Sequence, residues 1–147
     1  MRLNRRFLLL GLAVWPLLPA AAVANGAVRE AVLVPALGRG AAEVLSVATA
    51  LALFYAIAYA FLRRVRAPFT AADLWALGAC WAALAIVFEI VFFGVLMGVP
   101  MAELIAAYNI FAGELWPVVV VGVLIAPPLV GALVARRRAK EVRYPTR

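Results

Sequence analysis

The chain has 147 residues, of which 68% are hydrophobic and 14% charged. Soluble domains are about 45–50% apolar and about 25% charged, and a domain of this length has too little interior to bury such an excess. The composition therefore excludes a water-soluble globule, a disordered chain and a disulfide-stapled domain. It predicts an all-α integral membrane protein, a small bundle of three or four transmembrane helices. The formal net charge of +7 would suit a nucleic-acid-binding protein unless the basic residues have another role.

The N-terminal segment, residues 1–24, has two interpretations. Three arginines precede an uncharged run, and the triplet Ala22-Val23-Ala24 places small residues where a signal peptidase cleaves. This pattern favours a secretory signal peptide removed after Ala24. The alternative is a retained first transmembrane helix, since the uncharged run approaches the roughly 20 apolar residues that a span needs.

The remainder of the chain alternates between apolar and polar segments. Each apolar run is bounded by charged residues or by proline and glycine. The predicted segments are an outer segment with a short interfacial stretch (25–43), a transmembrane helix (44–62), a cytoplasmic loop (63–73), a second such helix (74–98), an outer loop with a short helix (99–114), a third such helix (115–135) and a basic cytoplasmic tail (136–147).

The basic residues predict the orientation of these segments. Twelve of the 14 Lys and Arg residues lie in the N-terminal segment, the middle loop and the tail, and only Arg29 and Arg39 lie elsewhere. The positive-inside rule places those three segments in the cytoplasm, and we expect the chain to lie in the cell inner (plasma) membrane. The charge therefore indicates orientation and contact with the lipid bilayer, and we expect no nucleic-acid partner.

Residue types that support catalysis are scarce. The sequence has no histidine and one cysteine, which removes disulfides and the common zinc and haem ligand sets. It has no glycine-rich phosphate-binding loop and no evident nucleophile–base pair. We expect no enzymatic activity, no cofactor and no bound metal.

Glu89 is the one ionisable residue well inside a predicted span. A carboxylate at that depth costs about 2.5–3.5 kcal/mol on insertion scales, so it is expected to pair or to serve a function. At about 1.5 Å rise per residue it lies roughly 22 Å along its helix, level with Ser46 and Thr49, and Arg39 could reach it from outside. A structural, hydrogen-bonded role is preferred over an ion, proton or substrate site.

Polar residues on the non-cytoplasmic side form a candidate site near the outer leaflet. The set comprises Glu89, Tyr108, Asn109, Glu114, Arg29 and Glu30.

Small residues predict where the helices approach one another. Gly94 and Gly98 form a G-x-x-x-G pair, and Ala52 and Ala56 belong to a four-residue alanine repeat; small residues at such spacing let helices pack closely. Pro127-Pro128 predicts a kink in the last span, because proline removes a backbone donor.

The sequence resembles a group of small bacterial inner-membrane proteins of unknown function over about residues 28 to 131. The matching residues are Val28-Arg29-Glu30, Leu33-Val34-Pro35, Gly38, Phe88-Glu89, Gly98, Leu104, Tyr108-Asn109, Gly113, Trp116 and Pro127. The chain departs from that pattern by lacking a histidine near residue 95, an acid before Tyr108 and an arginine after Gly113. The resemblance implies four hydrophobic helices and no particular activity.

Three functions remain open from the sequence. The preferred one is a non-enzymatic accessory or assembly subunit that packs against other membrane proteins or a second copy of itself. The alternative is a small transporter or channel component that uses Glu89, and a membrane-embedded enzyme comes third.

Overall fold

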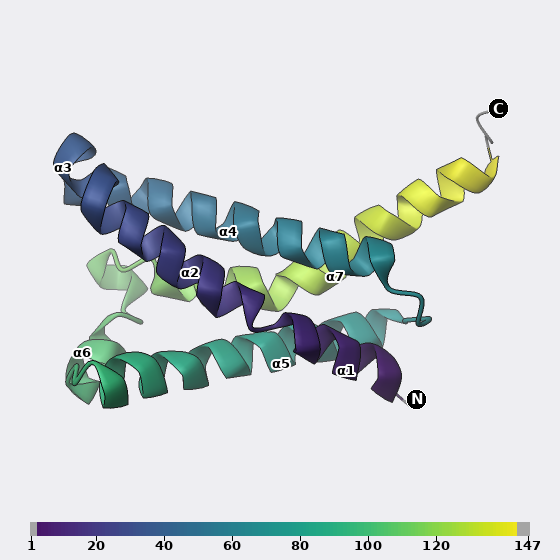
Figure 1. Cartoon of the computed structure of the whole chain (residues 1–147), viewed down its shortest axis with the longest axis horizontal. Helices are drawn as coiled ribbons and strands as arrows, with labels where there is room; N and C mark the ends of the chain where they lie inside the picture. The colour runs from purple at the N-terminus through teal and green to yellow at the C-terminus, as the bar shows by residue number, and fades with distance from the viewer. Residues whose placement is uncertain (1–2, 144–147) are drawn as a thin grey trace.

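The computed structural model describes residues 3–143, and the side chains of 3–137, as a bundle of helices (Figure 1). Its longer helices are α1 (Arg5–Val14), α2 (Leu17–Val28), α4 (Arg39–Arg64), α5 (Ala71–Glu89) and α7 (Trp116–Arg143). The shorter ones are the π-helices η1 (Arg29–Leu33) and η2 (Ile90–Leu96), the α-helices α3 (Val34–Leu37) and α6 (Met101–Ala106), and the 3-10 helix η3 (Ile110–Ala112).

Four stretches of the described chain are long and apolar enough to cross a membrane: Arg5–Leu37, Arg39–Arg64, Ala71–Leu96 and Trp116–Arg137. The predicted all-α membrane bundle is thus confirmed, and the described chain holds four such stretches, the first of which includes the segment with the signal-peptide pattern. Because the number of stretches is even, both termini lie at the same end of the bundle (Figure 1). We call this the basic end, because Arg5, Arg63 and Arg136 lie there. The opposite end, which carries α3 and α6, is the acidic end.

The first apolar stretch is longer than the sequence predicts. The Ala22-Val23-Ala24 triplet lies in the middle of α2, and the helix continues through η1 and α3 until Gly38 turns the chain with a φ of +78°. The interfacial stretch expected at 31–37 is therefore the end of this helix, and the next helix begins at Arg39 rather than at 44. Asn25 does not interrupt this helix, because its side chain donates to Ser46 of α4 rather than bonding to its own backbone.

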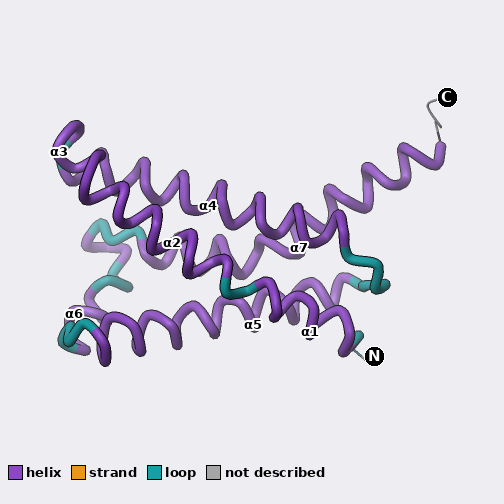
Figure 2. The backbone as a smooth tube through the Cα atoms, viewed as in Figure 1, coloured by secondary structure: helices purple, strands orange, loops and turns teal. Residues whose placement is uncertain are grey.

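Helix α7 is the centre of the bundle. It packs against both α4 and α5, while α1 packs against α5 and α2 against α4. The tube in Figure 2 shows α7 running between these neighbours, with loops at the two ends and the short break between α1 and α2 midway along the bundle. Phe54, Trp81 and Val123 are among the buried side chains that hold the helices together.

Two tryptophans join α1 to α5 at the break between α1 and α2. Pro16 follows the end of α1, and the Trp15 amide bonds to the Leu12 carbonyl rather than to that of Gly11. The freed Gly11 carbonyl accepts a hydrogen bond from Trp81 Nε1 (3.1 Å), and Trp15 Nε1 donates to the Trp81 carbonyl (3.3 Å). A break in a helix leaves backbone groups unpaired; here the Trp81 indole satisfies the freed Gly11 carbonyl, and the Trp15 indole adds a second bond to α5.

Among the glycines, the one that lies against the backbone of another helix is Gly78 and neither of the predicted pair. A Cβ on Gly78 would overlap the Leu124 carbonyl oxygen of α7, which has lost its helical donor because Pro128 carries no N–H. Gly94 instead packs beneath Leu104 of α6, and Gly98 is a turn residue with a φ of +71°.

The predicted alanine face of α4 also lies outside the core. Ala52 and Ala56 are exposed. The buried positions of α4 recur every four residues but are shifted by two along the chain: Ala42, Ser46, Ala50, Phe54, Ala58 and Leu62. Both rows have the same four-residue spacing, and the neighbouring helices decide which one is covered.

Candidate functional site

A cavity of about 850 Å³ occupies the acidic half of the bundle. Its floor is apolar and includes Leu18, Phe54, Phe88 and Val123, whereas its rim carries charged side chains. Both Arg39 at the rim and Phe54 at the floor lie on α4, so the cavity extends about 22 Å along the helix axes at 1.5 Å per residue.

The cavity arises from the break in the first helix. Helix α1 follows α5, but after Pro16 the chain crosses to α4, so that α2 and α5 diverge toward the acidic end (Figure 1). Side chains from α2, α4, α5, η2 and α7 line the space between them. Both π-helices border it, η1 through Arg29 and Glu30 and η2 through Phe92 and Phe93. Such irregular turns are frequent at functional sites.

Glu89 lies at the end of α5, where the helix becomes η2. Its side chain is 6% exposed. Tyr108 Oη and Trp116 Nε1 both donate to its Oε2, at 2.6 and 2.7 Å. Among the described residues none donates to Oε1, and Glu89 lines the cavity. One oxygen therefore fixes the loop that carries Tyr108 and the start of α7, while the other is left toward the cavity.

Tyr108 is held as a hydrogen-bond donor. Burial, and then its hydrogen bond to Glu89, raise the pKa of Tyr108 to about 12. The phenol keeps its proton at neutral pH and can donate it in the hydrogen bond to Glu89.

The residues expected to partner Glu89 contact other groups. Asn25 donates to Ser46 Oγ (2.7 Å), and Thr49 donates to Asn25 Oδ1 (2.8 Å). Arg39 lies 3.7 Å from Glu30. The depth along the helix did not decide the partners, because this face of α4 is turned toward α2 and not toward α5.

The predicted outer site is brought together in part. Tyr108 bonds directly to Glu89, and Arg29, Glu30 and Glu114 line the same cavity. Asn109 is exposed and serves the turn before α7, where its carbonyl accepts from the backbone amides of residues 112 and 114.

Three members of the acidic-end site were not singled out as site residues from the sequence. Glu43 and Glu103 also line the cavity, and Trp116 was not assigned to Glu89. An indole N–H at the start of a span is a plausible donor for a buried carboxylate, which is the signal that could have identified Trp116.

A second buried carboxyl, Asp73, lies at the basic end and was also missed. It is 1% exposed. Its Oδ1 accepts a hydrogen bond from the backbone amide of Asn4 (2.6 Å). Its Oδ2 accepts from the backbone amide and the side-chain hydroxyl of Thr70, each at 2.8 Å. The Thr-x-x-Asp spacing is a capping-box signal that was available in the sequence.

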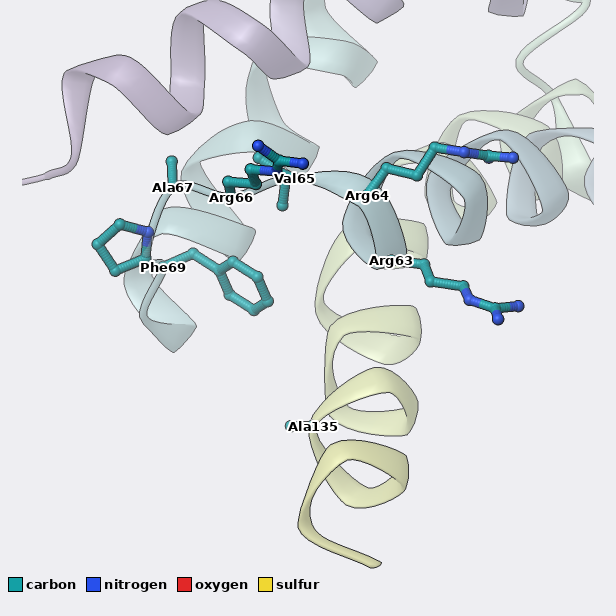
Figure 3. Close-up of a pocket in the computed structure, with 8 residues that line it drawn as sticks. Arg63, Arg64, Val65, Arg66, Ala67, Phe69 and Ala135 are labelled. Carbon is teal, nitrogen blue, oxygen red and sulfur yellow. The ribbon is translucent and has the colours of Figure 1, made fainter. Parts of the chain in front are cut away.

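A hollow of about 730 Å³ at the basic end is lined by Arg63, Arg64 and Arg66. Figure 3 shows that these side chains point in different directions, Arg63 and Arg64 away from Arg66. Their guanidinium groups do not converge on one point, as a specific anion site would require.

Within residues 3–137, no three Asp, Glu or Cys side chains are grouped closely enough to hold a metal ion. The chain matches no known family model, no curated protein and no solved structure.

Proposed function

We propose that the protein is a small, non-enzymatic inner-membrane protein that binds an amphiphilic molecule in the cavity of its acidic half. The cavity carries this proposal. Its volume of about 850 Å³ is within the range of about 300–1,000 Å³ usual for ligand sites. An apolar floor with a polar rim matches a molecule that has an alkyl portion and a polar head.

The proposed orientation puts the cavity in the outer leaflet. Arginines at Arg5, Arg63 and Arg136 favour a cytoplasmic basic end, which leaves the C-terminus in the cytoplasm and the outer loop on the other face. Retention of residues 1–24 is part of the proposal. It is supported by the Asn4 contact with Asp73 and by the complete burial of Phe7.

Photolabelling of the protein in phosphatidylcholine nanodiscs tests the proposal. The probe is a neutral long-chain alcohol with a mid-chain diazirine, and labelled residues are mapped by mass spectrometry. We expect saturable labelling of floor residues such as Phe54 and Val123. Ala22→Phe, which fills the cavity, should abolish it, and Ala24→Phe, at an exposed position on the same helix, should not. Unsaturable labelling of lipid-facing residues alone would refute the proposal.

An accessory or assembly subunit is the second candidate. It is favoured by a group of exposed apolar side chains at the acidic end: Val95 (73% exposed), Leu96 (69%), Met97 (64%), Ile105 (66%) and Phe111 (99%). Contiguous exposed apolar surface often marks interaction sites. Under this alternative a partner of fixed stoichiometry should co-purify in mild detergent, and Phe111→Ser should release it.

A further inference from the structure

We propose that the cavity selects amphiphiles with a cationic head group, of the alkylammonium class. This inference rests on the proposed function, since it assigns the charge of the ligand that the cavity would bind. It draws on the distribution of charge around the cavity and on the geometry of Glu89.

The cavity gathers most of the acid in the chain. The sequence has seven Asp and Glu residues, and five of them line it: Glu30, Glu43, Glu89, Glu103 and Glu114. The described lining holds two basic side chains, Arg29 and Arg39. Both contact the same acid, Glu30, at 3.0 and 3.7 Å. The other four carboxyl groups have no cationic partner among the described residues.

Glu89 supplies the buried anchor. Glu89 is only 6% exposed. The two groups that donate to it, the Tyr108 hydroxyl and the Trp116 indole, are neutral, and both bond to Oε2. The second oxygen faces the cavity without a donor. A carboxyl group in such a place is costly unless its charge is compensated, and an ammonium group in the cavity would give Oε1 both a donor and a countercharge.

The surroundings favour an organic cation over a metal ion. The carboxyl groups are spread around the cavity rather than grouped as metal ligands. The space below Glu89 is apolar, with Phe54, Phe88 and Val123 in its walls. An alkyl chain can occupy that floor while its ammonium head stays near Glu89 and the acidic rim.

Competition against the neutral diazirine alcohol tests the inference. The competitors are dodecylamine, dodecanol and dodecanoate, which share one chain length and differ in charge. In wild-type protein dodecylamine should compete at a concentration roughly tenfold lower than dodecanol, and dodecanoate should compete least.

Single substitutions should shift this selectivity in opposite directions. Glu89→Gln keeps an acceptor for Tyr108 and Trp116, and we expect it to remove most of the preference for the amine. Glu43→Gln, nearer the rim, should weaken the preference by a smaller factor. Arg39→Gln removes a positive charge from the rim and should strengthen it.

The outcomes separate the two proposals. Equal competition by amine and alcohol in wild-type protein would overturn the cationic selectivity while leaving amphiphile binding intact. A preference for the amine that survives both Glu89→Gln and Glu43→Gln would also overturn it. Saturable labelling that no dodecyl compound reduces would refute the proposed function itself.

Discussion

Asp73 and Glu89 are both buried carboxyl groups at helix ends, one at each end of the bundle, but their surroundings differ. Both oxygens of Asp73 accept hydrogen bonds from protein groups at 2.6 to 2.8 Å. Glu89 accepts both of its hydrogen bonds on one oxygen and turns the other toward a cavity. A carboxyl group whose two oxygens both accept hydrogen bonds from the protein stabilises the fold. One with an oxygen left without a donor can still bind a ligand.

The comparison also separates the two halves of the bundle. At the basic end the N-terminal helix follows α5, and its Asn4 reaches both Asp73 and the Pro68 carbonyl, the latter at 2.8 Å. At the acidic end the same helix has crossed to α4, and no comparable clamp joins it to α5 among the described residues. The following changes test this division, from the largest expected effect to the smallest.

Removing residues 1–24 should abolish the folded protein. The deletion takes away the fully buried Phe7 and the hydrogen bonds that join Trp81 to Trp15 and Gly11. It also removes the Asn4 backbone amide that donates to Asp73. We expect aggregation in size-exclusion chromatography after extraction in mild detergent, with the full chain as control. The intact mass of protein purified from membranes should include these residues. A stable, monodisperse product that begins at Asn25 would show that the contacts of Asn4 and Phe7 are not needed for folding.

Asp73→Ala should destabilise the protein by about 3 kcal/mol, because buried amide donors left unpaired cost about 1–3 kcal/mol each. Asp73→Asn should lose less, since it keeps one acceptor. Thermal unfolding in detergent measures the difference. Glu43→Ala is the matched control, a carboxyl group with no hydrogen-bond partner in the described chain, and it should change the midpoint little. Equal effects of the two alanine variants would show that the hydrogen bonds accepted by Asp73 add nothing to stability.

Glu89→Ala should cost about 1–3 kcal/mol, because it leaves the Tyr108 hydroxyl and the Trp116 indole without an acceptor. Glu89→Gln should stay within about 1 kcal/mol of wild type, since a neutral amide oxygen still accepts both bonds. The measurement is the thermal midpoint of unfolding in detergent. If glutamine were as damaging as alanine, the charge of Glu89 would be structural.

Of the changes that remove a hydrogen bond, Tyr108→Phe should have the smallest effect, about 1 kcal/mol for one bond. The pKa of Tyr108 is raised from 10.0 to about 12, so the folded state binds the phenolic proton more tightly than the unfolded state. This contribution is complete below about pH 10 and is lost as the pH rises through about 12. The stability gap between wild type and variant should therefore be constant from about pH 6 to 9. A gap that changes within that range would rule out this assignment.

Hydrophobic length made the class of the fold predictable, because the bilayer fixes how many apolar residues a span needs. The position of Glu89 within a span could be read in the same way. Its partners could not be predicted, because distance along a helix gives depth but not direction. Ser46 lines the same cavity as Glu89 but bonds to Asn25. Trp116, which does bond to Glu89, is 27 residues away in the chain, and only the packing of α5 on α7 brings it there.

The site differed from the prediction mainly where a break changes the course of a helix. Pro16 marks the break in sequence, but the transfer of the first helix from α5 to α4 depends on tertiary contacts such as Trp81 with Gly11. The cavity follows from that transfer. Glu43 and Glu103, far apart in sequence and unremarkable as single residues, line it together for the same reason.

The crossing of the N-terminal helix also imposes an order on assembly. Chains are synthesised from the N-terminus, and early segments fold first. Asn25 can bond to Ser46 and Thr49 once the second helix is made, whereas Trp15 must wait for Trp81 on the third. We therefore expect the first helix to dock at its acidic half before its basic half, and α7, which fills the centre, to arrive last. A pause in synthesis between the second and third helices would leave a hairpin joined at one end only.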